Sequence, residues 1–133
     1  MNATTAFELY KKTRTNTAVE DASPHKLITM MLDGALEKVA IAMGAMERKQ
    51  PAVTGESISK AISIVDNLRV AIDHDVGGKI AANLHDLYDY ITRRLLEANI
   101  MTDVSMLEEV AALLTEIKIA WAQVPTDLHE ITR

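Results

Sequence analysis

Cysteine is absent from this chain of 133 residues, and aromatic residues, glycine and proline are all scarce. Without a thiol the chain can form no disulfide framework and has no cysteine nucleophile. Aromatics make up 4% of the residues, and glycine and proline number 5 and 3, so strand formers and turn formers are few. Alanine, leucine, isoleucine, methionine and glutamate, which favour helices, are abundant instead. This composition predicts a single all-α domain.

Three further absences narrow the class of protein. No apolar run reaches the about 18 residues that a membrane span requires. The polar start of the chain lacks the basic region and apolar run of a secretory signal. With a net charge of −5, the chain also lacks the clustered lysine and arginine that phosphate binding requires. We therefore expect a cytosolic protein with no stable membrane insertion and no nucleic-acid partner.

Apolar residues recur at three- and four-residue steps in four segments, which is the spacing of amphipathic helices. The first helix is predicted to begin after Ser23 and Pro24, an N-cap residue and a good first helical residue, and to stop near Lys49. The paired glycines Gly77-Gly78 are predicted to separate the second helix from the third. The remaining helices are predicted at about 53–74, 79–100 and 103–124. Because the connections are short, we expect an antiparallel up-down-up-down four-helix bundle.

The ends of the chain do not follow this periodicity. Residues 1–22 are predicted to form an N-terminal arm or cap segment, in which Phe7 and Tyr10 lie one helical turn apart. The bundle should occupy 23–125, and 126–133 should be a frayed tail. Several helices are apolar over more faces than a bundle core requires. Three structures explain the surplus: a thicker core, a surface through which the free protein forms a homodimer, or a groove for a partner.

No arrangement of catalytic or metal-binding residues stands out. Di-iron bundles need Glu-x-x-His on two helices, and no glutamate in this chain is followed by histidine at that spacing. His85 and Asp89 are spaced to share a helix face, which fits an exposed polar pair better than a metal site. A histidine phosphotransfer bundle would use His74 or His85, but His74 is expected at a helix end. We therefore predict a binding protein without cofactor or metal, rather than an enzyme.

An ordered set of short motifs runs through nearly the whole chain. It comprises Tyr10, Ala22-Ser23-Pro24, Leu27, Met31-Leu32-Asp33-Gly34-Ala35, Gly77-Gly78-Lys79-Ile80-Ala81-Ala82-Asn83-Leu84, Leu87-Tyr88-Asp89-Tyr90, Arg93-Arg94-Leu95, Glu97-Ala98-Asn99, Asp103 and Ala120-Trp121. At these spacings the set resembles the flagellin-specific export chaperones of bacterial flagella, the FliS family. The pattern differs within its helix 1 motif, where family members generally carry a tyrosine between the leucine and Asp33.

The resemblance implies a four-helix bundle with an N-terminal cap segment. It also implies a cytoplasmic chaperone that binds the disordered C-terminal region of flagellin, prevents its premature polymerisation and delivers it to the gate protein of the type III export apparatus. The surplus apolar faces would then be grooves for partner helices, partly covered by the N-terminal arm when flagellin is absent. The candidate partner-binding residues are Phe7, Tyr10, Met31, Gly34, Tyr88, Tyr90 and Trp121. The alternative is a regulatory adaptor bundle that binds a different protein.

Overall fold

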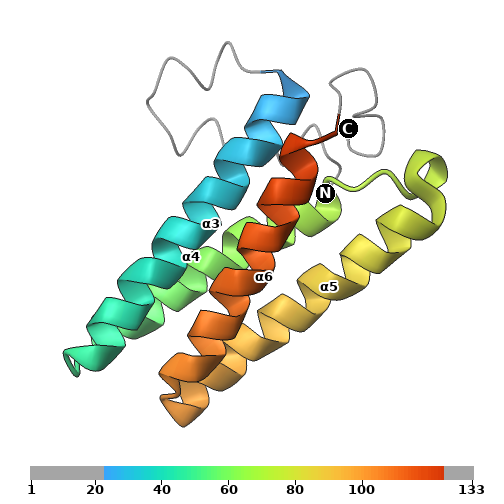
Figure 1. The fold of residues 1–133 in the computed structure, drawn as a ribbon. Coiled ribbons are helices and arrows are strands. Elements are labelled where there is room, and N and C mark those ends of the chain that lie inside the picture. Colours follow the sequence, from blue (N-terminus) through green and yellow to red (C-terminus); the bar gives the residue numbers. More distant parts are fainter. Residues whose placement is uncertain (1–22, 125–133) are drawn as a thin grey trace.

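Residues 23–124 are described by the computed structural model, and they form four α-helices (Figure 1). In chain order the helices are α3 (Pro24–Glu47), α4 (Pro51–Val70), α5 (His74–Met101) and α6 (Val104–Ala122). Helices α3 and α5 each pack against both α4 and α6, so the four surround one core. This arrangement confirms the predicted all-α, antiparallel up-down-up-down bundle. The predicted N-terminal arm and the predicted tail lie outside the described residues.

Two helices begin at the N-caps that the sequence predicts. The Ser23 hydroxyl accepts a hydrogen bond from the backbone N–H of Lys26 at 3.2 Å, and Pro24 occupies the first turn of α3. The Asp103 carboxylate accepts one from the N–H of Ser105 at 2.9 Å, at the start of α6. Each bond satisfies one of the backbone donors that a helix leaves unpaired at its N-terminus.

The paired glycines lie at an interruption of the helical backbone, as predicted, but they do not end the second helix. Helix α4 already ends at Val70, and Ile72 leaves the helix with its side chain buried in the core. Helix α5 starts at His74, before the glycines, and Gly78 kinks it with φ 55° and ψ −128°. Residues other than glycine rarely adopt that conformation. The glycines therefore bend the start of α5 instead of ending α4.

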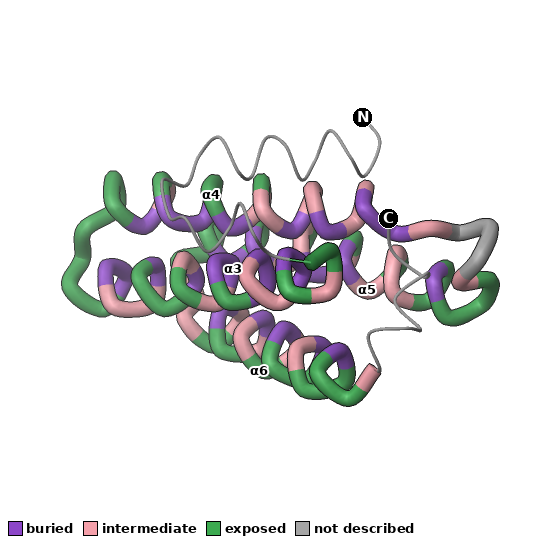
Figure 2. Tube along the Cα trace, turned by 90° about the horizontal axis from the view of Figure 1, so that it is seen from above, coloured by how far each residue is buried: buried purple, intermediate pink, exposed green. Residues whose placement is uncertain are grey.

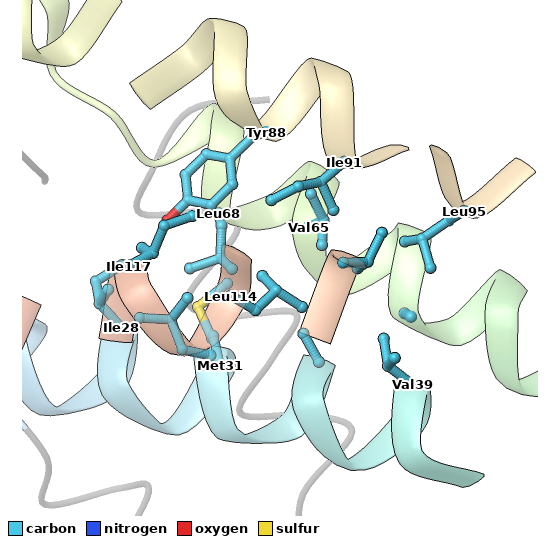
Figure 3. Packing of buried hydrophobic residues seen from close by; sticks show 14 of the residues in the cluster. Ile28, Met31, Val39, Val65, Leu68, Tyr88, Ile91, Leu95, Leu114 and Ile117 are labelled. Carbon is cyan, nitrogen blue, oxygen red and sulfur yellow. The ribbon is translucent and has the colours of Figure 1, made fainter. Parts of the chain in front are cut away.

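The core is built from the apolar faces of all four helices. Figure 2 shows buried positions recurring along each helix, with exposed positions between them. In the middle of the bundle, Met31 of α3 and Leu114 of α6 approach Leu68 of α4 and Tyr88 of α5 (Figure 3). These four side chains are almost completely buried, as the helical periodicity of the apolar residues predicts.

One end of the bundle is closed by two tight connections with left-handed backbone. Lys49 and Thr102 have φ values of 57° and 50°, and each follows the last turn of a helix. The N–H of the next residue then donates a hydrogen bond to a carbonyl in the last turns of the helix. Gln50 donates to the Ala45 carbonyl at 2.9 Å, and Asp103 donates to the Ala98 carbonyl at 3.1 Å. Glycine is the residue that favours this turn, and a β-branched threonine is strained in it.

Replacing Thr102 by glycine should therefore stabilise the protein. Relief of the left-handed strain outweighs the added freedom of the unfolded chain, and we expect a gain of about 1 kcal/mol in the free energy of unfolding. Urea denaturation followed by circular dichroism measures it. Thr115→Gly is the matched control, because Thr115 lies within α6 and its replacement should cost roughly 0.3 kcal/mol. Equal effects at the two positions would contradict strain at Thr102.

Candidate functional site: an apolar groove between α5 and α6

Helices α5 and α6 are joined at one end of the bundle and diverge toward the other (Figure 1). Near the open end lies an apolar groove of about 310 Å³. All four helices contribute to it, and Asn83 is the one amide among its lining residues. The lining residues are Ile28, Leu32, Leu68, Ile72, Ile80, Asn83, Leu84, Leu87, Tyr88, Ile117, Ala120, Trp121 and Val124.

The groove has a buried floor and an exposed wall. Leu32, Leu68 and Tyr88 lie at its base and are almost inaccessible to water. Figure 3 shows the Tyr88 ring pointing from α5 toward the side chains of Leu68 and Ile117. Ile80, in the first turn after the Gly78 kink, is 66% exposed. The groove therefore offers apolar surface to water in the form that an amphipathic partner helix can cover.

The burial of Tyr88 raises the pKa of its phenol well above the usual value. Removing the hydroxyl from water disfavours the charged phenolate, so this side chain stays neutral. The base of the groove thus carries no charge from Tyr88 at any pH near neutrality.

A reciprocal contact between His25 and Trp121 holds the edge of the groove between α3 and α6. The Trp121 indole Nε1–H donates to the His25 carbonyl at 2.9 Å, and the His25 Nε2 lies 3.1 Å from the Trp121 carbonyl, which can only accept a hydrogen bond from it. The rings stack with centroids 4.6 Å apart and planes at 16°. The start of α3 is thereby fixed to the end of α6, and the Trp121 ring is held in the groove lining.

A polar bridge joins α5 to α6 nearer their connection. The Tyr90 hydroxyl donates to Glu109 Oε2 at 2.8 Å, and Arg94 Nε donates to Glu109 Oε1 at 2.7 Å. Arg94 also donates to Glu97 at 3.3 Å. The hydrogen bond from Tyr90, followed by that from Arg94, lowers the pKa of the Glu109 carboxyl below its usual value. The bridge therefore favours the ionised form of Glu109, and it makes this part of the contact between α5 and α6 polar.

Replacing Glu109 by glutamine should make the free energy of unfolding depend less steeply on pH below about pH 6. A carboxyl whose pKa is lower in the folded chain than in the unfolded chain adds stability above its unfolded pKa and loses it as pH falls through the folded pKa. The stability difference between the two proteins should therefore shrink as pH drops from 6 through the ordinary glutamate pKa of 4.5 and below. Urea denaturation at each pH measures it. The neighbouring exposed Glu108→Gln is the control, and an identical profile for both variants would contradict the role of the bridge.

The structure brings together some of the residues predicted to bind a partner, but not all of them. Tyr88 and Trp121 line the groove together, while Tyr90 lies in the polar bridge. Met31 and Gly34 are buried in α3 and are not part of the groove lining. The remaining two candidates, Phe7 and Tyr10, lie outside the described residues.

Sequence reasoning missed much of the groove wall. Ile80, Leu84 and Leu87 line the groove from the apolar stripe of α5, and none of them was among the predicted partner-binding residues. A helical stripe has the same spacing whether it packs inside a bundle or faces a groove. The one signal that was available is the place of Ile80, directly after a glycine pair and at the end of the stripe.

None of the helices within residues 23–124 is long and apolar enough to cross a membrane. Over the same residues, no three histidine, aspartate or glutamate side chains are grouped so that they could hold a metal ion.

Comparison with known proteins identifies the family. The family model described as "Flagellar protein FliS" matches residues 6–127. The chain belongs to the FliS family. It is 46% identical over 121 residues to the flagellar secretion chaperone FliSB of Pseudomonas aeruginosa, covering 91% of this chain and 96% of that protein. It is 42% identical over 125 residues to the flagellar secretion chaperone FliS of Salmonella typhimurium, covering 93% of each.

A more distant member of the family also matches most of the chain. The flagellar secretion chaperone FliS of Bacillus subtilis is 32% identical over 106 residues, which cover 80% of this chain and 78% of that protein. The family is one of flagellar export chaperones and not of enzymes. This confirms the predicted resemblance and the prediction that the chain is not an enzyme.

Proposed function

We propose that this protein is a cytoplasmic export chaperone that binds the disordered C-terminal region of flagellin in the groove between α5 and α6. While bound, flagellin cannot polymerise prematurely, and the complex delivers it to the gate protein of the flagellar type III export apparatus. The observation that carries the proposal is an apolar groove whose wall residue Ile80 is 66% exposed, in a chain of the FliS family.

The groove suits a segment that folds as it binds. The flagellin tail is amphipathic, and laying its apolar face against Leu84, Leu87 and Trp121 hides that face from other flagellin molecules. Ordering a disordered segment costs about 2–5 kcal/mol or more, so the interface has to extend beyond a single pocket. Burial of apolar area contributes about 25 cal/mol per Å², which offsets this cost over a wide contact.

The N-terminal arm has its own part in the proposal. Phe7 and Tyr10, within residues 1–22, cover part of the groove when flagellin is absent. They leave the groove when flagellin binds. The exposed apolar groove also provides a surface through which the free protein forms a homodimer.

Tyr10→Ala should alter flagellin binding, because it removes part of the N-terminal cover, while leaving helicity and thermal stability near their original values. A collapse in thermal stability would show instead that Tyr10 packs in the core.

Calorimetry with the C-terminal segment of the host's flagellin tests the proposal directly. We expect a 1:1 complex with a negative change in heat capacity, because apolar surface is buried on binding. The helical circular dichroism signal of the mixture should exceed the sum of the signals of the two components, because the flagellin segment becomes helical when it binds. An absence of detectable binding at high micromolar concentrations would refute the flagellin assignment.

A further inference from the structure

Tyr88 places a hydroxyl group in the groove between α5 and α6. It is the one hydroxyl among the described residues of the groove lining, and the residue is only 2% exposed. The other polar groups of this lining have a partner or lie in water. The Trp121 indole N–H donates to the His25 carbonyl, and Asn83 is exposed. A buried tyrosine hydroxyl normally has a hydrogen-bond partner, so the surroundings of this one bear on what the groove binds.

The Tyr88 hydroxyl has no hydrogen-bond partner within residues 23–124. Burial alone raises the pKa of the phenol, without a contribution from a hydrogen bond. Figure 3 shows the oxygen end of the ring directed toward the apolar side chains of Leu68 and Ile117. The oxygen is not sealed off, because Thr92 Oγ1 is the one side-chain polar atom of the described residues that is both unpaired and inaccessible to water. Since Tyr88 lines the groove, water in the groove reaches its hydroxyl in the free protein.

A partner that covered the groove with apolar side chains alone would expel this water and leave the hydroxyl unpaired, at a cost of about tenfold or more in affinity. The backbone of a helical partner cannot supply the missing acceptor, because its carbonyls already bond to its own N–H groups. A carboxylate does not suit the site either. The described lining holds no lysine, arginine or histidine, and an ionised group without a counter-charge is costly to bury. The acceptor that fits is a neutral polar side chain.

We propose that the groove selects a segment whose apolar face is interrupted by one amide or hydroxyl side chain, which accepts a hydrogen bond from the Tyr88 hydroxyl. This inference rests on the proposed function, because the segment is the C-terminal region of flagellin. The apolar wall supplies most of the affinity, whereas the hydrogen bond fixes the register of the segment along α5. A segment shifted by one helical turn, about 5.4 Å, would place an apolar group against the hydroxyl and lose the bond.

Tyr88→Phe tests the inference, because it removes the hydroxyl and keeps the ring. No described residue bonds to that hydroxyl, so the urea midpoint of the free protein should not change. The flagellin C-terminal segment should bind about five- to tenfold more weakly, since its polar side chain loses its donor. Tyr90→Phe is the matched control. The Tyr90 hydroxyl donates to Glu109 outside the groove lining, so its loss should lower the urea midpoint and leave binding unchanged.

Variants of the flagellin segment identify the acceptor. Each asparagine, glutamine, serine and threonine of the segment is replaced in turn by leucine, methionine, alanine and valine, respectively. One of these replacements should weaken binding to the unsubstituted protein by about five- to tenfold and have no such effect on binding to the Tyr88→Phe variant. The other replacements should change the affinity for the two proteins by equal factors.

Three results would overturn the inference and leave the proposed function standing. The first is equal binding of the segment by Tyr88→Phe and the unsubstituted protein. The second is a urea midpoint lowered as far by Tyr88→Phe as by Tyr90→Phe, because the hydroxyl would then bond within the protein. The third is a segment in which no position is coupled to Tyr88, because a retained water would then be the partner. An absence of binding by the unsubstituted protein would refute the proposed function, and this inference with it.

Discussion

Ile80→Asp should weaken the binding of the flagellin C-terminal segment by about 100-fold, or roughly 2.7 kcal/mol. Ile80 is the most exposed large apolar residue of the groove lining, so most of its side chain gains contacts only when a partner covers it. Aspartate loses this apolar contact and must also give up water as the partner docks. Calorimetric titration of the variant with the flagellin segment measures the loss.

The same substitution should leave the free protein intact. Ile80 is 66% exposed and lies in the first turn after the Gly78 kink, where a negative charge is favourable at the helix N-terminus. Ile119→Asp is the matched control, because Ile119 is 55% exposed on α6 and does not line the groove. Unchanged binding by Ile80→Asp, or an equal loss in both variants, would show that the partner does not occupy this groove.

Trp121→Ala should lower the free energy of unfolding by about 3–5 kcal/mol, a large part of the 5–15 kcal/mol typical of a domain. Trp121 is only 5% exposed, so the truncation removes a large buried surface and leaves a cavity. The variant also loses the stack on His25 and the hydrogen bond to its carbonyl. Urea denaturation followed by far-ultraviolet circular dichroism measures the change.

Trp121→Phe separates the two contributions. Phenylalanine keeps an aromatic ring against His25 but cannot donate to its carbonyl, so we expect a loss of about 1–2 kcal/mol. A similar loss for the alanine and phenylalanine variants would mean that the hydrogen bond dominates and that the ring packs loosely. A loss below about 1 kcal/mol for alanine would contradict the buried position of the indole ring.

The helices could be predicted from sequence because the signals for them are local. Ser23 and Asp103 act as N-caps through bonds to residues two or three positions away, and such bonds can be anticipated from the chain alone. The end of α4 could not be predicted in this way. Its position depends on Ile72, which leaves the helix to reach the core, and that packing involves side chains from other helices.

The groove could be predicted only in part. The aromatic residues Tyr88 and Trp121 were chosen because such side chains suit interfaces, and both line the groove. The contact that fixes Trp121 comes from His25, which is 96 positions away in sequence. Neither a periodic pattern nor a short motif records a pair at that separation, and so His25 was not predicted to contribute.

The His25–Trp121 contact has a practical consequence for experiments on this protein. Because it fixes the first turn of α3 to the last turn of α6, a tag or fusion partner joined directly before α3 or directly after α6 is attached beside the groove. Such an addition competes with the cargo for space and would falsify affinities measured on tagged protein. The connection at Arg48–Gln50, at the closed end of the bundle, is the better place for an inserted label or epitope.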